Sequence, residues 1–138
     1  MKHFLTLILC LPFLSFAQKK EYPIKRTSTA PLIDGNSNEA TWTTVNEANT
    51  FTEFYPNQGT TINQKFNTSW KATYDDKAIY FLVTMKDNQA DSIMSQLCKR
   101  DEILGSNNDY IEIRINPYQD GQTDFSFSIN PLLSLIHI

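Results

Sequence analysis

The chain has 138 residues, and its 12 basic and 15 acidic side chains give it a formal charge of -3 near neutral pH. This mildly acidic balance, without a basic cluster, argues against nucleic acid as a partner. Aromatic residues make up 12% of the chain and glycine occurs only four times, which favours one small folded domain rich in β-structure over a disordered chain.

The first 17 residues have the three parts of a secretory signal peptide. Lys2 and His3 precede an apolar run that ends at Phe16, and Ala17 completes a small-x-small cleavage site. The run is shorter than the roughly 20 residues that span a bilayer and contains a proline, which argues against a membrane anchor. We therefore expect residues 1–17 to be removed on export to the periplasm, the outer membrane or the extracellular space.

The mature chain is expected to begin with a polar, basic lead-in segment, residues 18–29, that contains a short edge strand near residues 22–25. A domain then spans residues 30–130. Its first part has a turn at Asp34-Gly35 and a single helical turn at residues 39–43. The lead-in is thus predicted to contribute at most one strand to the fold.

A first β-hairpin is predicted at residues 66–86. Its strands, residues 66–74 and 78–86, are joined by the tight connection Asp75-Asp76-Lys77. The second strand has apolar residues on both faces, which predicts that it is central and covered on each side. Such cover is typical of an all-β fold, a two-sheet β-sandwich of immunoglobulin or jelly-roll type.

A second hairpin is predicted from strict alternation in residues 110–115 and 124–129, with a turn at residues 116–123. Its isoleucines are expected to point inward, and Glu112 and Arg114 to lie on the outward face. The segment that follows, residues 131–138, stops before a sandwich of this kind could close. We expect the chain to be the front part of a longer protein and this tail to be non-native coding sequence, the alternative being a short terminal strand.

The connection between the hairpins is polar and longer than twenty residues, which predicts a short helix, placed at residues 91–97, or a functional role. Calcium binds several oxygen ligands that converge from loops. Carboxylates that could converge here make a structural calcium site one hypothesis and solvated loop residues the alternative. The candidate ligands are Asp87, Asp101 and Asp109. Asp91 lies in the same connection and could converge with them, and Asp120 and Asp124 flank the nearby turn.

The order of short motifs along the chain resembles the carbohydrate-binding module family 9-like domain. It is most similar to the version at the N-terminus of large exported bacterial proteins whose remaining length is predicted to form a β-barrel. The resemblance covers about residues 30–130. The matching residues are Ile33-Asp34-Gly35, Glu39, Trp42, Tyr74-Asp75-Asp76, Ala78-Ile79-Tyr80, Asp87, Arg100-Asp101-Glu102, Asp109 to Ile113, Asn116 to Gly121 and Asp124-Phe125.

This resemblance implies a sugar-binding β-sandwich, often attached to a glycoside-degrading enzyme and sometimes holding structural calcium. Glu112 matches the acidic position from which sugar-binding members bond the ligand. Those members have a tryptophan where this chain has Ser106. From the residues themselves, Tyr118 and Tyr55 are the candidate exposed platforms for a sugar ring, and Arg114 is a candidate beside Glu112. An ordinary solvated residue is the alternative for Glu112.

Three functions follow as hypotheses. The first is a non-catalytic module that binds an oligo- or polysaccharide in an exported protein of xylan- or cellulose-type catabolism. The second is a structural domain that docks against a C-terminal β-barrel region of the same protein, which Ser106 favours. The third is a part of a glycoside hydrolase. Catalysis by this domain itself is poorly supported, because the only histidine beyond the signal peptide is His137.

Overall fold

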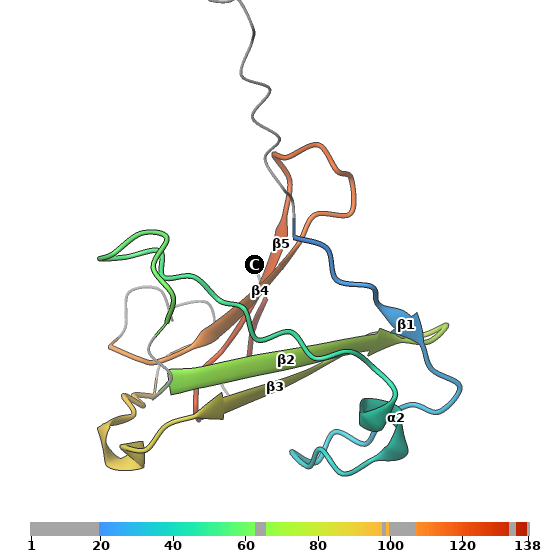
Figure 1. The fold of residues 1–138 in the computed structure, drawn as a ribbon, viewed down its shortest axis with the longest axis horizontal. Coiled ribbons are helices and arrows are strands. Elements are labelled where there is room, and N and C mark those ends of the chain that lie inside the picture. The colour runs from blue at the N-terminus through green and yellow to red at the C-terminus, as the bar shows by residue number, and fades with distance from the viewer. Residues whose placement is uncertain (1–19, 63–65, 98, 100–106, 133–134, 138) are drawn as a thin grey trace, which may run out of the picture. The chain divides into compact units, whose positions relative to one another are not determined.

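The computed structural model describes residues 20–62, 66–97, 99, 107–132 and 135–137 (Figure 1). The predicted signal peptide, Asp101 and Ser106 lie outside these residues. The chain divides into two compact units. The first unit contains residues up to 61 together with 68–84, and the second contains residues 62–67 together with 85 onwards. Each unit is described by itself.

The first sheet has the strand order β1-β2-β3, formed by β1 (Lys25–Arg26), β2 (Asn67–Tyr74) and β3 (Ile79–Lys86). The predicted first hairpin is therefore confirmed to within a residue at each strand start. The prediction that its second strand is central is wrong for the described residues. The lead-in strand β1 pairs in parallel with β2, which leaves β3 at the edge.

The outer position of β3 explains its exposure. Ile79 is 51% exposed and Met85 61% exposed, although both belong to a continuous apolar run. A run of apolar residues shows that a segment suits a strand, but it does not show which neighbour the strand pairs with. The pairing is decided instead by Lys25 and Arg26, which lie opposite Thr73 and Tyr74 on the other side of β2.

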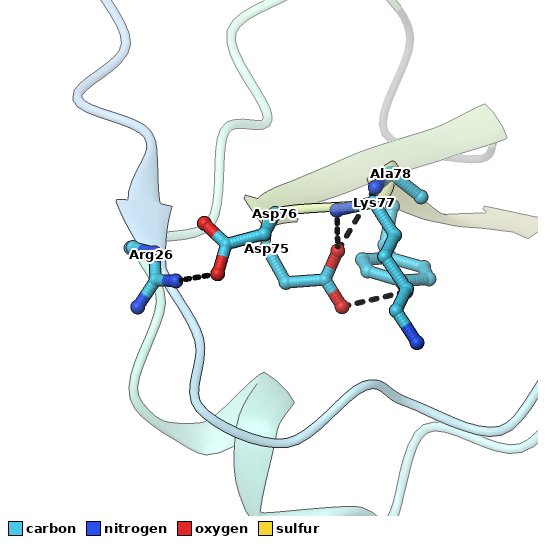
Figure 2. Close-up of polar contacts among 6 residues, drawn as sticks. Arg26, Asp75, Asp76, Lys77 and Ala78 are labelled. Carbon is cyan, nitrogen blue, oxygen red and sulfur yellow. Dashed lines mark hydrogen bonds and ion pairs between the residues drawn. The ribbon is translucent and has the colours of Figure 1, made fainter.

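The connection between β2 and β3 is held by one carboxylate (Figure 2). Asp75 Oδ1 accepts hydrogen bonds from the backbone N–H groups of Lys77 at 2.7 Å and Ala78 at 2.9 Å, and Oδ2 accepts one from the Tyr80 hydroxyl at 3.0 Å. The two backbone donors lower the pKa of Asp75, and the bond to Asp75 raises the pKa of Tyr80. Asp76 pairs with Arg26. Both acids are turn residues, as predicted.

The core of the first unit lies around Trp42. This residue is in α2 (Ala40–Thr43), the predicted single helical turn, and it is buried together with Val45 and Ala72. The Tyr22 ring lies 4.3 Å from the Trp70 ring, centroid to centroid, and the Tyr22 hydroxyl accepts a bond from Ala72 N–H. The lead-in segment is therefore fixed by its side chains as well as by β1.

The second sheet has the order β4-β5-β6, formed by β4 (Ile111–Ile115), β5 (Phe125–Ile129) and β6 (Leu135–His137), with both pairs antiparallel. The predicted second hairpin is confirmed as β4 and β5. The segment after residue 130, which stood outside the expected pattern, contains the strand β6. In Figure 1 the strands of this second sheet are coloured from orange to red.

The helix predicted at residues 91–97 is mostly wrong. Only the short 3₁₀ helix η2 (Ala90–Ser92) forms there. Beyond it the chain is held at Met94, where the backbone N–H donates to the Asp109 carboxylate at 3.0 Å and the carbonyl accepts from Asp109 N–H at 2.8 Å. These bonds tie the segment to a residue 15 positions away, which prevents the backbone from continuing its local helical bonds.

The described chain is thus almost entirely strand and irregular structure, with two three-stranded sheets and helices of four and three residues. The prediction of an all-β fold is confirmed, and two sheets are the components of the predicted sandwich. Within the described ranges there is also no helix of the length and apolarity that crossing a membrane requires.

Candidate functional site

The polar face of the β4–β5 hairpin is the candidate site. Successive side chains on a strand point to opposite faces, so Glu112 and Arg114 share one face of β4. In the antiparallel register Glu112 lies opposite Ser128, and Arg114 lies opposite Ser126. These four residues, Glu112, Arg114, Ser126 and Ser128, form what we call the polar face. The isoleucines of β4 lie on the other face of the hairpin, as predicted.

Both carboxylate oxygens of Glu112 have partners on this face. Oε1 accepts a hydrogen bond from the Ser126 hydroxyl and lies 3.1 Å from Nε of Arg114, and Oε2 accepts a bond from an Nη of Arg114 at 3.2 Å. The bond from Ser126 and then those from Arg114 lower the pKa of Glu112. The side chain is only 19% exposed, so Glu112 is not an ordinary solvated residue.

Arg114 connects two carboxylates. Besides its bonds to Glu112, its Nη1 lies 3.8 Å from Oδ2 of Asp124. The hydrogen bonds to Glu112 raise the pKa of Arg114, so it remains a cation. Its side chain is largely exposed, and a guanidinium has five N–H donors, so donors remain directed at solvent. The face therefore offers a fixed anion, a cation and a hydroxyl close together.

The turn at residues 116–123 is fixed by two side chains. Asp120 Oδ1 accepts hydrogen bonds from the backbone N–H groups of Gln122 and Thr123, each at 2.9 Å, and these lower its pKa. Asn116 donates to the same carboxylate at 3.1 Å and accepts from the Tyr118 N–H at 3.1 Å. The ring of Tyr118 is 67% exposed. The predicted platform is thus exposed on a turn with a fixed backbone.

The four predicted sugar-binding residues fall into two groups. Glu112, Arg114 and Tyr118 all belong to the β4–β5 hairpin of the second unit, whereas Tyr55 belongs to the first. Tyr55 is 84% exposed in a loop described below. The structure brings Glu112 and Arg114 into direct contact. Ser126 was not predicted, because its place opposite Arg114 follows from the hairpin register and not from a local pattern.

The three predicted calcium ligands stand as follows. Asp87 accepts a bond from Gln89 N–H at 2.7 Å, Asp109 accepts the bond from Met94 already described, and Asp101 lies outside the described residues. Across the part of the chain that the structure describes, no three acidic, histidine or cysteine side chains are grouped as a metal ion requires. Structural calcium therefore stays a prediction.

Comparison with protein families gives one match. A family model described as carbohydrate family 9 binding domain-like matches residues 33–130. The chain belongs to this family. The match to the family 9-like domain includes both hairpins, Glu112 and Arg114, and it names carbohydrate as the class of ligand for a type of domain that is generally non-catalytic. No curated protein and no solved structure matches the chain.

Proposed function

We propose that this domain is a non-catalytic module that binds xylan- or cellulose-type polysaccharide for an exported protein of polysaccharide breakdown. The observation that carries the proposal is the Glu112–Arg114 pair, held on the polar face by Ser126. The export signal predicted at residues 1–17 supports a place in the periplasm, the outer membrane or the extracellular space.

The chemistry of the polar face suits sugar hydroxyls. Each hydroxyl donates one hydrogen bond and accepts others, so it is bound best by a carboxylate and a guanidinium next to each other. Glu112 supplies the acceptor and Arg114 the donors. A sugar ring also presents C–H edges that pack on an aromatic face, which the exposed ring of Tyr118 supplies on the same hairpin.

The same groups are unsuited to glycoside hydrolysis. A hydrolase needs one carboxyl that is protonated at neutral pH and can donate to the leaving oxygen. The pKa of Glu112 is lowered, and its nearest acidic neighbour across Arg114, Asp124, faces the same cation. Glu112 is therefore kept ionised, which supports binding and not acid catalysis.

The direct test is thermal unfolding of the chain with soluble xylo- and cello-oligosaccharides, followed by calorimetric titration. Ligand should raise the melting temperature of the wild-type chain. Glu112→Gln should lose most of this increase, because it removes the carboxylate charge and the strong hydrogen bonds that the charge makes possible. Glu21→Gln, an exposed acid of the lead-in segment, is the matched control and should bind as wild type does. A wild-type chain that shows no shift across a glycan panel would falsify the proposal.

A second candidate is a domain that docks against a C-terminal β-barrel region of the same protein. It is favoured by Ser106. The resemblance given in the sequence analysis implies a tryptophan at this position in the family members that bind sugar. The two candidates differ in one measurement. Docking predicts no response to any soluble glycan, together with increased stability when the downstream region is present on the same chain.

A further inference from the structure

The loop at residues 52–61, which we call the aromatic loop, is closed by its own backbone. Thr52 and Thr61 form an isolated antiparallel bridge, and Glu53 N–H donates to the Thr60 carbonyl at 2.9 Å. Inside this closure, Gly59 N–H donates to the Glu53 carbonyl at 2.9 Å. The loop, green in Figure 1, therefore keeps its shape without cover from another element.

Side chains at the base of the loop add to this closure. The Thr60 hydroxyl lies 2.9 Å from Oε2 of Glu53 and 2.8 Å from the Asn57 carbonyl, within hydrogen-bond reach of both. Gly59 has a φ of +83°, a left-handed conformation that glycine adopts without strain. None of these contacts involves the rings of Phe54 or Tyr55, so the fold of the loop does not explain why those rings are there.

Both rings are directed at solvent. Phe54 is 83% exposed and Tyr55 84% exposed, and every residue from 54 to 61 is exposed. Adjacent aromatic side chains left in water on a fixed loop are typical of a binding surface, because burying them would otherwise stabilise the fold. Since all of these residues are exposed, the two rings lie on open surface and do not line a cavity within the described residues.

The chemistry around the rings selects the class of ligand. Glu53 is the only charged residue in the aromatic loop, and Thr60 already contacts its carboxylate. A surface whose one charge is a carboxylate has no attraction for nucleic acid or for anionic lipid. The exposed amides of Asn57 and Gln58 follow the rings in the chain after one proline, Pro56. Aromatic faces beside planar amides match the C–H faces and hydroxyl rims of sugar rings.

We propose that the aromatic loop is a second carbohydrate contact, which takes the flat face of an insoluble polysaccharide through Phe54 and Tyr55. Asn57 and Gln58 bond hydroxyls at its rim. This inference rests on the proposed function, since it assigns the form of polysaccharide that the same domain holds. The polar face of the β4–β5 hairpin would take soluble chains, and the aromatic loop would take surfaces.

The test is depletion of the chain from solution by insoluble cellulose and by insoluble xylan. The double variant Phe54→Ala with Tyr55→Ala should bind the better of these about tenfold more weakly than wild type, and Tyr55→Phe should keep most of the affinity because it keeps the ring. Ile33→Ala is the matched control. Ile33 is an equally exposed apolar residue of the first unit without an aromatic face, and its removal should have no effect.

The possible results separate the two proposals. If the double variant binds the solids as wild type does, or if Ile33→Ala weakens binding equally, the inference is overturned, the second result indicating general apolar adsorption. Thermal shifts with soluble oligosaccharides should be the same for wild type and the double variant. If soluble oligosaccharides produce these shifts but the double variant binds the solids as wild type does, the proposal for the aromatic loop fails and the proposed function stands. If wild type binds neither form, both proposals fail.

Discussion

Ser126 donates a hydrogen bond to Glu112 across the β4–β5 pair, although the two residues are 14 positions apart in the chain. They are diagonal neighbours, because Ser126 lies directly opposite Arg114 in the register. The position of the Glu112 carboxylate therefore depends on a strand that follows a separate turn. A serine with no charge of its own fixes the anion of the candidate site.

Ser126→Ala is expected to raise the pKa of Glu112 toward its ordinary value and to lower the free energy of unfolding by about 1 kcal/mol at pH 7. A carboxyl with a lowered pKa in the folded state contributes stability above its unfolded pKa, and this contribution is lost as the pH falls through the folded pKa. Urea unfolding of wild type and variant should therefore differ at pH 7 and converge in acid. Ser126→Thr keeps the hydroxyl and is the control. A difference in unfolding free energy that persists in strong acid would show that the effect does not come from the ionised Glu112.

Asp120→Ala should loosen the turn that carries Tyr118. The Asp120 carboxylate accepts two backbone bonds and one from Asn116, so its removal leaves three donors without their acceptor. Asp120→Asn retains an acceptor oxygen and should behave nearly as wild type does. Hydrogen exchange at the Gln122 and Thr123 amides measures the effect. Equal exchange in the two variants would mean that the carboxylate does not hold the turn.

Gly59→Ala should destabilise the closed form of the aromatic loop by about 1 kcal/mol, because an L-residue is strained at a φ of +83°. No atom lies within 4 Å of an added Cβ, so the cost comes from the backbone alone. Gly59→Asn should cost less, since asparagine tolerates the left-handed region better. Exchange of the Thr60 amide should be about fivefold faster in the alanine variant. An unchanged rate would exclude strain as the reason for glycine here.

Trp42→Ala should lower the free energy of unfolding by about 3–5 kcal/mol, because it opens a large cavity at a buried position of α2. Trp42→Phe keeps an aromatic ring and should cost substantially less. Chemical denaturation followed by circular dichroism gives both values. A loss below about 1 kcal/mol for the alanine variant would show that the residue does not belong to the core.

The calcium hypothesis has a test of its own. If Asp87, Asp101 and Asp109 hold the ion, calcium should raise the melting temperature of the chelator-treated chain, and Asp101→Asn should abolish the increase. Glu21→Gln, a change of an exposed acid outside this connection, is the control. Asp101 is the informative position, because Asp87 and Asp109 also accept backbone hydrogen bonds whose loss alone would lower stability. No increase for wild type would exclude the site.

The elements that could be predicted from the sequence are those determined by near neighbours. Alternation located the strands 67–74, 111–115 and 125–129, a continuous apolar run located the strand 79–86, and the acids at 75 and 76 marked the turn of the first hairpin. The edge position of β3 could not be predicted, because it depends on the pairing of Lys25 with Thr73, 48 positions away. The prediction of a helix at residues 91–97 was wrong for the same reason, since Asp109 forms hydrogen bonds with the backbone N–H and carbonyl of Met94.

The candidate site was predicted only in part. Glu112 and Arg114 share a face by strand periodicity, which is visible in the sequence. Their contact with Ser126 depends on the register of a hairpin whose turn is long, so no local pattern specifies it. Of the residues in the aromatic loop, only Tyr55 was predicted to bind a ligand. Its closure depends on Thr60 and Gly59, which carry no signal of a binding surface by themselves.

The two oxygens of Glu112 are already occupied before any ligand arrives. A carboxylate has about four lone-pair sites, so an incoming hydroxyl can either add to Glu112 or replace Arg114 or Ser126 there. Where it replaces one of them, the free energy of binding is the difference between two sets of bonds and not the sum of one. If the domain binds polysaccharide as proposed, we expect modest affinity and rapid release at this pre-paired site, which would let the module rebind many times along one polymer.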